Sequence, residues 1–152
     1  MTAALTWTDK SFAELTPHQL YEILQLRQAV FVVEQNCPYL DADGCDQMSR
    51  HLCGHDAHGL VAYARLVPAG IKHPEPSIGR VITVGRARGT GIGKALMHLA
   101  VARMVELCAG VPIVLGAQAH LQRFYAEFGF VVFGEPYDED GIPHIDMRRT
   151  AA

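Results

Sequence analysis

Apolar side chains recur at helical spacing near the start of the chain. Residues 18–35, HQLYEILQLRQAVFVVEQ, place such a series on one face, which predicts one long amphipathic helix. This face carries Leu20, Ile23, Leu24, Val30 and Phe31, with Arg27 at the same spacing. Thr16 and Pro17 are typical of a helix start, because threonine caps free N–H groups and proline fits the first turn. Pro38 disfavours helical geometry at the residue before it, so the helix should end near residue 37.

Short runs that are alternating or continuously apolar predict strands over much of the remaining chain. We expect strands at residues 5–12, 51–55, 59–69, 78–84, 111–118, 130–135 and 144–150. Helices are expected at 91–109 and at 120–130, where Gly129 should stop the second one. This order predicts a single α/β domain over residues 1–152 with a mixed sheet. The strand at 78–84, the helix after it and the strand at 111–118 should form a right-handed parallel unit.

The composition narrows the class of protein. The 152 residues are 49% hydrophobic and 19% charged, which is typical of a folded globular domain. A formal net charge of −3 argues against a nucleic acid partner, and no apolar run approaches the length of a membrane span. The N-terminus lacks the pattern of a secretory signal, and the four cysteines form no CxxC pair. We therefore expect a cytoplasmic protein with no membrane partner.

Residues 78–100, IGRVITVGRARGTGIGKALMHLA, lead from a strand-like run through spaced glycines into a helix. Glycines at such a junction favour a phosphate-binding loop, because the backbone can approach the anion closely. A Walker loop is excluded, since Arg88 stands at its first glycine position and Ala95 at its metal-binding hydroxyl. A GxGxxG dinucleotide loop is excluded because Lys94 occupies its third glycine position.

The same region is locally basic, which indicates a bound polyanion. No acidic residue lies between Glu75 and Glu106, whereas five cationic residues do. They are Arg80, Arg86, Arg88, Lys94 and Arg103. For the glycines alone, a tight turn between strand and helix is the alternative.

Three segments carry a resemblance to one superfamily. Residues 88–93, RGTGIG, resemble motif A of the GNAT N-acetyltransferases, which is written Arg/Gln-x-x-Gly-x-Gly/Ala and binds acetyl-CoA. Residues 118–130, QAHLQRFYAEFGF, resemble motif B, although Gln118 replaces the usual asparagine and Leu121 the usual alanine. Tyr125 and the final Gly-Phe keep their places in that motif. Residues 26–46, LRQAVFVVEQNCPYLDADGCD, closely resemble the ElaA-like branch of the superfamily.

The resemblance implies a GNAT-type acyl-CoA N-acyltransferase fold, with about seven mixed strands flanked by about four helices. It implies direct transfer of the acetyl group from acetyl-CoA to a primary amine in a ternary complex, with no metal. The strands at 78–84 and 111–118 should splay apart to admit the cofactor. The acceptor would be a small-molecule or peptide amine, and a homodimer is a possible assembly.

The resemblance also implies a set of residues that contact acetyl-CoA. They are Ile82, Val84, Arg88, Gly89, Thr90, Gly91, Gly93, Lys94 and Gln118. Backbone N–H groups near Ile82 and Thr83 would polarise the acetyl carbonyl and stabilise negative charge on its oxygen.

Candidate catalytic residues follow from two proton transfers. The leaving CoA thiolate needs a proton, and the resemblance places the phenol of Tyr125 beside the sulfur. The attacking amine needs a base, for which Glu34 and His144 are candidates and His51 a weaker third. Each has a structural alternative: Tyr125 as a core aromatic, Glu34 as a solvated carboxylate or a partner of Arg27, and His144 as a packing residue of the last strand.

Asp41, Asp43 and Asp46 lie in one loop at the presumed acceptor entrance and are candidates for binding a cationic amine. Ordinary solvated loop acids are the alternative.

Two other functions remain open from the sequence. His51, Cys53 and His55 alternate along a predicted strand and, with His58 or Cys45, resemble a loose zinc set of no standard spacing. A non-catalytic module that binds acetyl-CoA is the second alternative.

Overall fold

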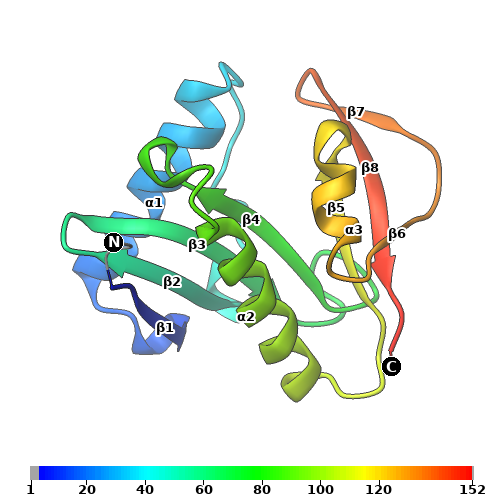
Figure 1. Ribbon diagram of the computed structural model, residues 1–152, viewed down its shortest axis with the longest axis horizontal. Helices are drawn as coiled ribbons and strands as arrows, with labels where there is room; N and C mark the ends of the chain where they lie inside the picture. The colour runs from blue at the N-terminus through cyan, green and yellow to red at the C-terminus, as the bar shows by residue number, and fades with distance from the viewer. Residues whose placement is uncertain (1–3, 152) are drawn as a thin grey trace.

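The computed structural model describes residues 4–151, and these form one sheet of eight strands with helices on both faces (Figure 1). The strands run in the order β1-β2-β3-β4-β5-β8-β6, and β7 pairs with β8. Their bounds are β1 Thr6–Ser11, β2 Arg50–Asp56, β3 Gly59–Val67, β4 Ser77–Thr83, β5 Ile113–Gln118, β6 Val131–Val132, β7 Tyr137–Glu139 and β8 Ile142–Arg149. The helices are α1 Pro17–Arg27, α2 Ile92–Leu107 and α3 Gln122–Ala126. The mixed α/β sheet predicted from the sequence is confirmed.

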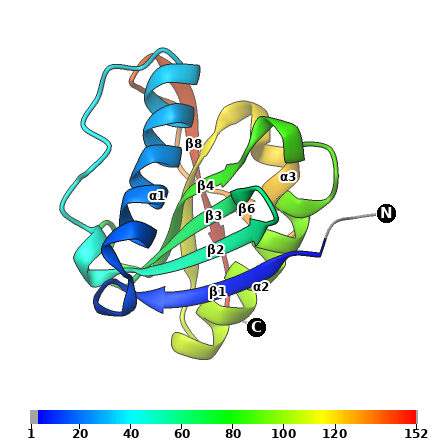
Figure 2. The ribbon, with the colours of Figure 1, turned by 90° about the vertical axis from the view of Figure 1, so that its left-hand side faces the viewer.

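Helix α1 covers one face of the sheet, whereas α2 and α3 lie on the other (Figure 2). The larger core cluster packs apolar residues of α2, such as Leu96 and Met104, against the central strands. A smaller cluster packs Ile23 and Val30 against Tyr63 on the opposite face. Every residue of β3 from 60 to 67 is buried, because both faces of this strand are covered. None of the helices between residues 4 and 151 has the length and apolarity to cross a bilayer.

The first helix changes type where the sequence predicts continuity. Helix α1 begins at the predicted cap, where Gln19 N–H donates to Thr16 Oγ1 at 3.1 Å. After Arg27 the chain continues as a π-helix at Gln28–Glu34. Its wider turn is visible in bonds such as Cys37 N–H to the Val32 carbonyl, at 3.0 Å. A π-helical turn is rare and is frequent at functional sites.

The end of the chain also differs from the prediction. The expected strand at 130–135 is reduced to Val131–Val132, because Gly134 turns the chain with a φ of 79°. An additional short strand, β7, forms before β8. Asp140 and Gly141 connect these two strands with φ angles of 53° and 81°, as a two-residue hairpin turn requires.

Strands β4 and β5 diverge, as the resemblance to the GNAT superfamily implies. They are parallel neighbours, and only Ser77 and Val114 pair along their length. Strand β4 is also irregular where it faces this opening: its register against β3 slips between Gly79 and Ile82, and Arg80 has a φ of 50°. A bulge of this kind leaves backbone N–H and C=O groups unpaired that would be hydrogen-bonded in a regular ladder.

Candidate active site

A cavity of about 490 Å³ occupies the opening between β4 and β5. Its walls come from the π-helix and the loop after it, the β3–β4 connection, β4, β5 and the β7–β8 hairpin. Among the candidates from the sequence, this cavity brings together Asp43, Gln118, Tyr125 and His144. Residues far apart in the chain therefore line one site.

The phosphate loop, residues 84–91, joins β4 to α2 and leaves a helix N-terminus open. Gly89 and Gly91 have φ angles of 78° and 88°, which L side chains rarely adopt. Gly91 is the N-cap of the 16-residue helix α2, and no side chain within residues 4–151 caps it. The first N–H groups of α2 are therefore available to an anion. Gly93 has a packing role, since a Cβ there would lie 3.3 Å from Thr83 Oγ1.

Other polar groups of the phosphate loop are engaged within the protein. The hydroxyl of Thr90 donates to the Ala87 carbonyl at 2.5 Å. The N–H of Val84 donates to the Val61 carbonyl at 2.9 Å, so this amide is not free for a ligand. Because hydrogen bonds alternate along an antiparallel strand, it is the N–H of Thr83 that faces the opening. Lys94 contacts Glu127 at 3.3 Å.

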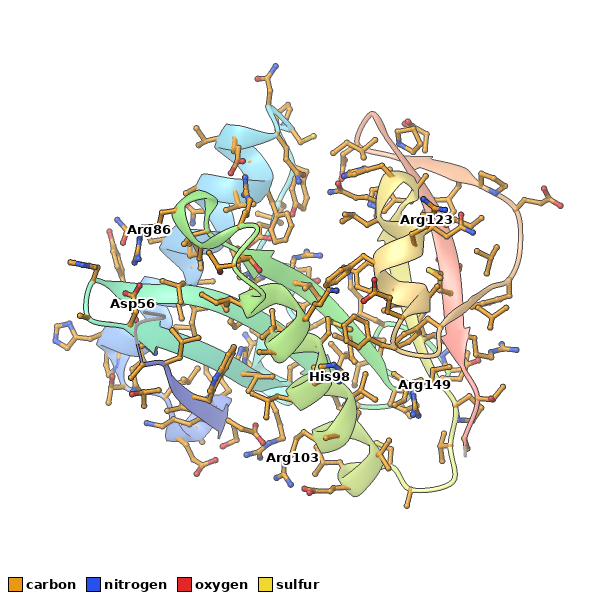
Figure 3. The ribbon with its side chains drawn as sticks, in the orientation of Figure 1. Asp56, Arg86, His98, Arg103, Arg123 and Arg149 are labelled. Carbon is orange, nitrogen blue, oxygen red and sulfur yellow. The ribbon has the colours of Figure 1, made fainter. Side chains whose placement is uncertain are left out.

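Two arginines of the phosphate loop form ion pairs with other elements. Arg86 pairs with Asp56 of the β2–β3 turn, and the two side chains point toward each other in Figure 3. Arg88 donates from Nε to the Thr83 carbonyl at 2.9 Å and binds Glu34 through both terminal nitrogens, at 2.6 and 3.1 Å. The hydrogen bonds from Arg88 lower the pKa of Glu34, which makes its carboxylate a weaker base. The suggested Glu34–Arg27 pair is wrong, because Arg27 binds Asp41 and Asp46.

Tyr125 of α3 borders the cavity and is 7% exposed. Its hydroxyl makes no hydrogen bond to another residue of the described chain, 4–151, and burial raises the pKa of the phenol to about 12. The ring also packs in the core with Phe130, so the structural interpretation and the functional one coexist. A phenol with this pKa keeps its proton throughout the neutral range.

His144 of β8 lies opposite Gln118 of β5 at the open end of the cavity. Its Nδ1 lies 2.7 Å from the Ile142 carbonyl, which can only accept, so Nδ1 carries the proton of the neutral ring. Nε2 is then a lone-pair acceptor, 3.4 Å from Glu139. The ring stacks on Tyr137 with centroids 5.8 Å apart.

The aspartate loop, residues 36–48, is held by a buried network that the sequence analysis missed. The network contains Arg27, Arg65, Lys72, Arg80, Asp41, Asp43 and Asp46. Arg27 binds Asp41 at 2.8 Å and Asp46 at 2.6 Å, and its side chain has no solvent exposure. Arg80, from the bulge of β4, binds Asp41 at 2.9 Å.

The structure argues against the prediction that these three aspartates bind a cationic amine, because their charges are already paired within the protein. Asp41 and Asp46 are buried, and every carboxylate is bound by at least one cation. Burial by itself would raise the pKa of Asp43, but hydrogen bonds from Arg65 and Lys72 outweigh it and lower that pKa. The alternative of ordinary solvated loop acids is wrong for the same reason.

His51 and the loose zinc set have other roles in the structure. His51 Nδ1 lies 2.7 Å from the Tyr63 hydroxyl and Nε2 lies 2.9 Å from the Asp46 carbonyl, so both nitrogens are engaged. Burial lowers the pKa of His51. His55 instead contacts Glu22 at 2.7 Å. No group of three potential metal ligands is assembled among residues 4–151.

The cavity wall also includes residues that sequence reasoning did not propose for the site. They are chiefly Tyr39, Arg65, Lys72, Arg80, Tyr137 and Glu139. Arg65 stands in a fully buried strand, and an arginine in such a run signals a buried partner. This signal was present in the sequence, although it could not identify the partner.

Comparison with known proteins places this geometry in one family. A family model described as an acetyltransferase (GNAT) domain matches residues 28–151. The chain belongs to the GNAT acetyltransferase family, whose members transfer acyl groups from acyl-CoA.

Within the family the chain is similar to the ElaA group. Protein ElaA of Escherichia coli is 48% identical over 147 residues, covering 95% of this chain and 96% of that protein. The crystal structure of Escherichia coli ElaA superposes with a TM-score of 0.91 at 47% identity, over 96% of this chain and 99% of that one. An acyl-CoA N-acyltransferase from Pseudomonas aeruginosa superposes with a TM-score of 0.92 at 46% identity, over 97% and 100%.

Proposed function

We propose that this protein transfers the acetyl group of acetyl-CoA to a primary amine by direct attack within a ternary complex. One observation carries the proposal: β4 leads from the opening between β4 and β5 to the N-terminus of α2, and the opening is bordered by Tyr125. Within residues 4–151, no side chain caps that N-terminus and none bonds the hydroxyl of Tyr125. Acetyl-CoA supplies an activated thioester when bound. The chain contributes binding, orientation and proton transfer.

The phosphate loop is suited to the pyrophosphate of CoA. The free N–H groups at the start of α2 and the positive φ of Gly89 and Gly91 allow the backbone to surround an anion. The N–H of Thr83 lies on the edge of β4 that does not pair with β3, which supports its role as the donor to the acetyl carbonyl. Gln118, at the end of β5, borders the same cavity from the other side.

Tyr125 is the proposed proton donor to the CoA thiolate. As the amine nitrogen bonds to the carbonyl carbon and the carbon–sulfur bond breaks, the phenolic proton moves to sulfur. A pKa near 12 ensures that the phenol is protonated before each turnover. One proton leaves the ammonium group of the acceptor for the general base before attack, and the second, lost from nitrogen after attack, returns through solvent to the phenolate of Tyr125.

His144 is the proposed base for the amine. Its Nδ1–H is fixed by the Ile142 carbonyl, so Nε2 presents a lone pair at the cavity. Glu34 is the less suitable base because Arg88 binds both of its oxygens, and we propose that it positions the phosphate loop instead. Of the candidates, His51 has no free nitrogen.

The test begins with calorimetric titration of the protein with acetyl-CoA, with ATP and NADH as controls, followed by thiol release over an amine panel. We expect selective binding of acetyl-CoA and thiol release that depends on both substrates. Failure to bind acetyl-CoA would refute the proposal, and binding without turnover on any amine would favour a non-catalytic module.

Tyr125→Phe tests the proton donor. It removes only an oxygen that has no partner within residues 4–151, so we expect the fold and the affinity for acetyl-CoA to be preserved. We expect kcat to fall by about a hundredfold, the lower end of the range for a general acid. Tyr21→Phe, on an exposed tyrosine of α1, is the matched control. An unchanged kcat for Tyr125→Phe would remove Tyr125 from the reaction.

A further inference from the structure

The network around the aspartate loop carries more positive than negative charge. Four cationic side chains face three carboxylates, which leaves one positive charge without a counter-charge in the network. His51 does not change the balance, because burial lowers its pKa and favours the neutral ring. Tyr39 donates its hydroxyl to Asp41 at 3.0 Å, and burial raises its pKa, so it adds no negative charge.

The unbalanced charge lies on the cavity wall and not deep in the core. Arg65, Lys72 and Arg80 all line the cavity. The side chain of Lys72 is 39% exposed and that of Arg80 is 18% exposed, so a ligand can reach both. Lys72 uses its ammonium group on Asp43 at 3.0 Å, and an ammonium has three donors. His73 adds a further polar ring to the same wall.

Arg65 provides a second, independent sign of an unmatched donor. Its side chain is 1% exposed, and its two terminal nitrogens bind Asp43 and Asp46. Its Nε–H is buried and has no hydrogen-bond partner among the described residues. Buried polar groups in native proteins are nearly always paired, and Arg65 lines the cavity, so the unpaired donor is a second sign of unmatched positive potential at this wall.

The part of the cavity wall that comes from the β7–β8 hairpin has the reverse character. Glu139, whose side chain is 60% exposed, contacts only His144 Nε2 at 3.4 Å among residues 4–151. Asp140 follows it in the hairpin turn and also lines the cavity. This is the part of the wall at which the proposed base, His144, would meet the amine. One cavity therefore has an acidic pole for an ammonium group and a basic pole for an anion.

We propose, on the basis of the acetyltransferase function above, that the acceptor is an amino carboxylate: a free amino acid or the end of a short peptide. Its ammonium group lies at the pole of Glu139 and His144, and its carboxylate lies at the pole of Lys72 and Arg80. One unbalanced positive charge suits a singly charged carboxylate. A polyamine would leave the basic pole unmatched and would bring further positive charge to it.

The experiment compares matched pairs of acceptors. Initial rates of thiol release are measured for amino acids and dipeptides and for the amines that lack only the carboxylate, with phosphoethanolamine as a second anion. We expect kcat/KM to be about tenfold or more higher for the carboxylate member of the best pair, the usual value of a charged hydrogen bond. Equal or better use of the decarboxylated amines, or a preference for the phosphate, overturns the proposal.

Two variants locate the effect. Lys72→Met removes the reachable ammonium group, and we expect the ratio of kcat/KM within the pair to fall towards one, with Lys72→Arg restoring it. Lys10→Met, on a lysine of β1 that is remote from the cavity, should leave the ratio unchanged. If neither methionine variant changes the ratio of kcat/KM, the assignment of Lys72 to the basic pole is overturned.

Titration of products keeps this test separate from that of the proposed function. N-acetylated amino acids and their decarboxylated counterparts are titrated into the protein in the presence of CoA. We expect the carboxylates to bind about tenfold more tightly. If acetyl-CoA binds but both product series bind equally, the amino carboxylate is refuted while the acetyltransferase function stands. If acetyl-CoA does not bind, the function itself fails.

Discussion

The aspartate loop and the phosphate loop are both polar connections beside the same cavity, but different forces order them. Asp41 of the aspartate loop binds Arg27, 14 residues away in the chain, and Arg80, 39 residues away. In the phosphate loop, the backbone order is local: two glycines take positive φ angles, and Arg88 caps a carbonyl five residues before it. Its two arginines also pair with distant residues, but those pairs are exposed. Charges are enclosed in the first loop, whereas backbone donors are left open in the second.

Because of this difference, the aspartate loop stabilises the fold, whereas the phosphate loop can bind a ligand. Enclosed carboxylates have partners fixed by the fold, so they stabilise the bulge of β4 and cannot attract a ligand freely. Open N–H groups have no protein partner, so a bound anion can satisfy them. The function of a polar loop therefore depends on which of its groups already have partners within the protein, and the residue types alone do not decide it.

The largest expected effect comes from removing the centre of the enclosed network. Arg27→Met leaves Asp41 and Asp46 buried without their main counter-charge. We expect the free energy of unfolding to fall by about 3–5 kcal/mol, as for other broken buried pairs. Urea denaturation measures the loss. Arg123→Met, on an exposed arginine of α3 (Figure 3), should change stability by less than about 0.5 kcal/mol. Equal small losses for both would show that the network does not hold the fold.

A second effect concerns acid. The pKa values of Asp43 and Asp46 are lower in the folded protein than in the unfolded chain, where 3.8 is the reference. Their stabilising contribution is therefore complete above about pH 4, and it is lost as the pH falls through the folded-state values, because the unfolded chain binds protons first.

We expect the midpoint of urea denaturation to decline steeply below about pH 4. Asp43→Asn should be less stable at neutral pH and should show a shallower decline, since one of the titrating groups is gone. A parallel decline in both proteins would mean that Asp43 contributes no acid sensitivity.

The open loop is probed by Gly91→Asp. The substitution places a side chain at a φ of 88° and a carboxylate beside the proposed phosphate site. We expect acetyl-CoA to bind about tenfold or more weakly, while stability falls by about 1 kcal/mol from backbone strain. Gly134→Asp is matched, because Gly134 has a φ of 79° and equally open surroundings far from the loop. Equal affinity for acetyl-CoA in the two variants would show that the phosphate loop does not bind the cofactor.

The contrast between the loops also explains how far the sequence could predict this protein. The phosphate loop was predictable because its signal is local: glycine spacing, a flanking strand and a helix start. The divergence of β4 and β5 followed from the resemblance that this loop supported, and the structure confirms it.

The network was not predictable in the same way. The sequence of a loop does not show whether an aspartate in it is solvated or enclosed. Only the fold brings Arg65 to Asp43 and Arg80 to Asp41. The π-helical turn after Arg27 was missed because apolar spacing does not distinguish it from an α-helix over so few residues. Long-range pairing therefore set the limit of the sequence analysis.

The smallest expected effect lies at the exposed ion pair between Glu34 of the π-helix and Arg88 of the phosphate loop. Glu34→Gln removes the charge that compensates Arg88 beside the phosphate loop. Because the pair is exposed, we expect acetyl-CoA to bind more tightly by no more than about fivefold, the upper value of a surface ion pair. We expect kcat to change by less than about twofold if His144 is the base, since the hydrogen bond from Nδ1 leaves the lone pair on Nε2.

Glu106→Gln provides the control, since Glu106 pairs with Arg103 near the other end of α2. It should leave both the affinity and kcat unchanged. A fall in kcat of about a hundredfold in Glu34→Gln would assign the base to Glu34 in spite of its bound state. A weaker affinity for acetyl-CoA with kcat intact would instead mean that Glu34 orders Arg88 for the phosphate. The phosphate loop would then depend on a distant partner just as the aspartate loop does.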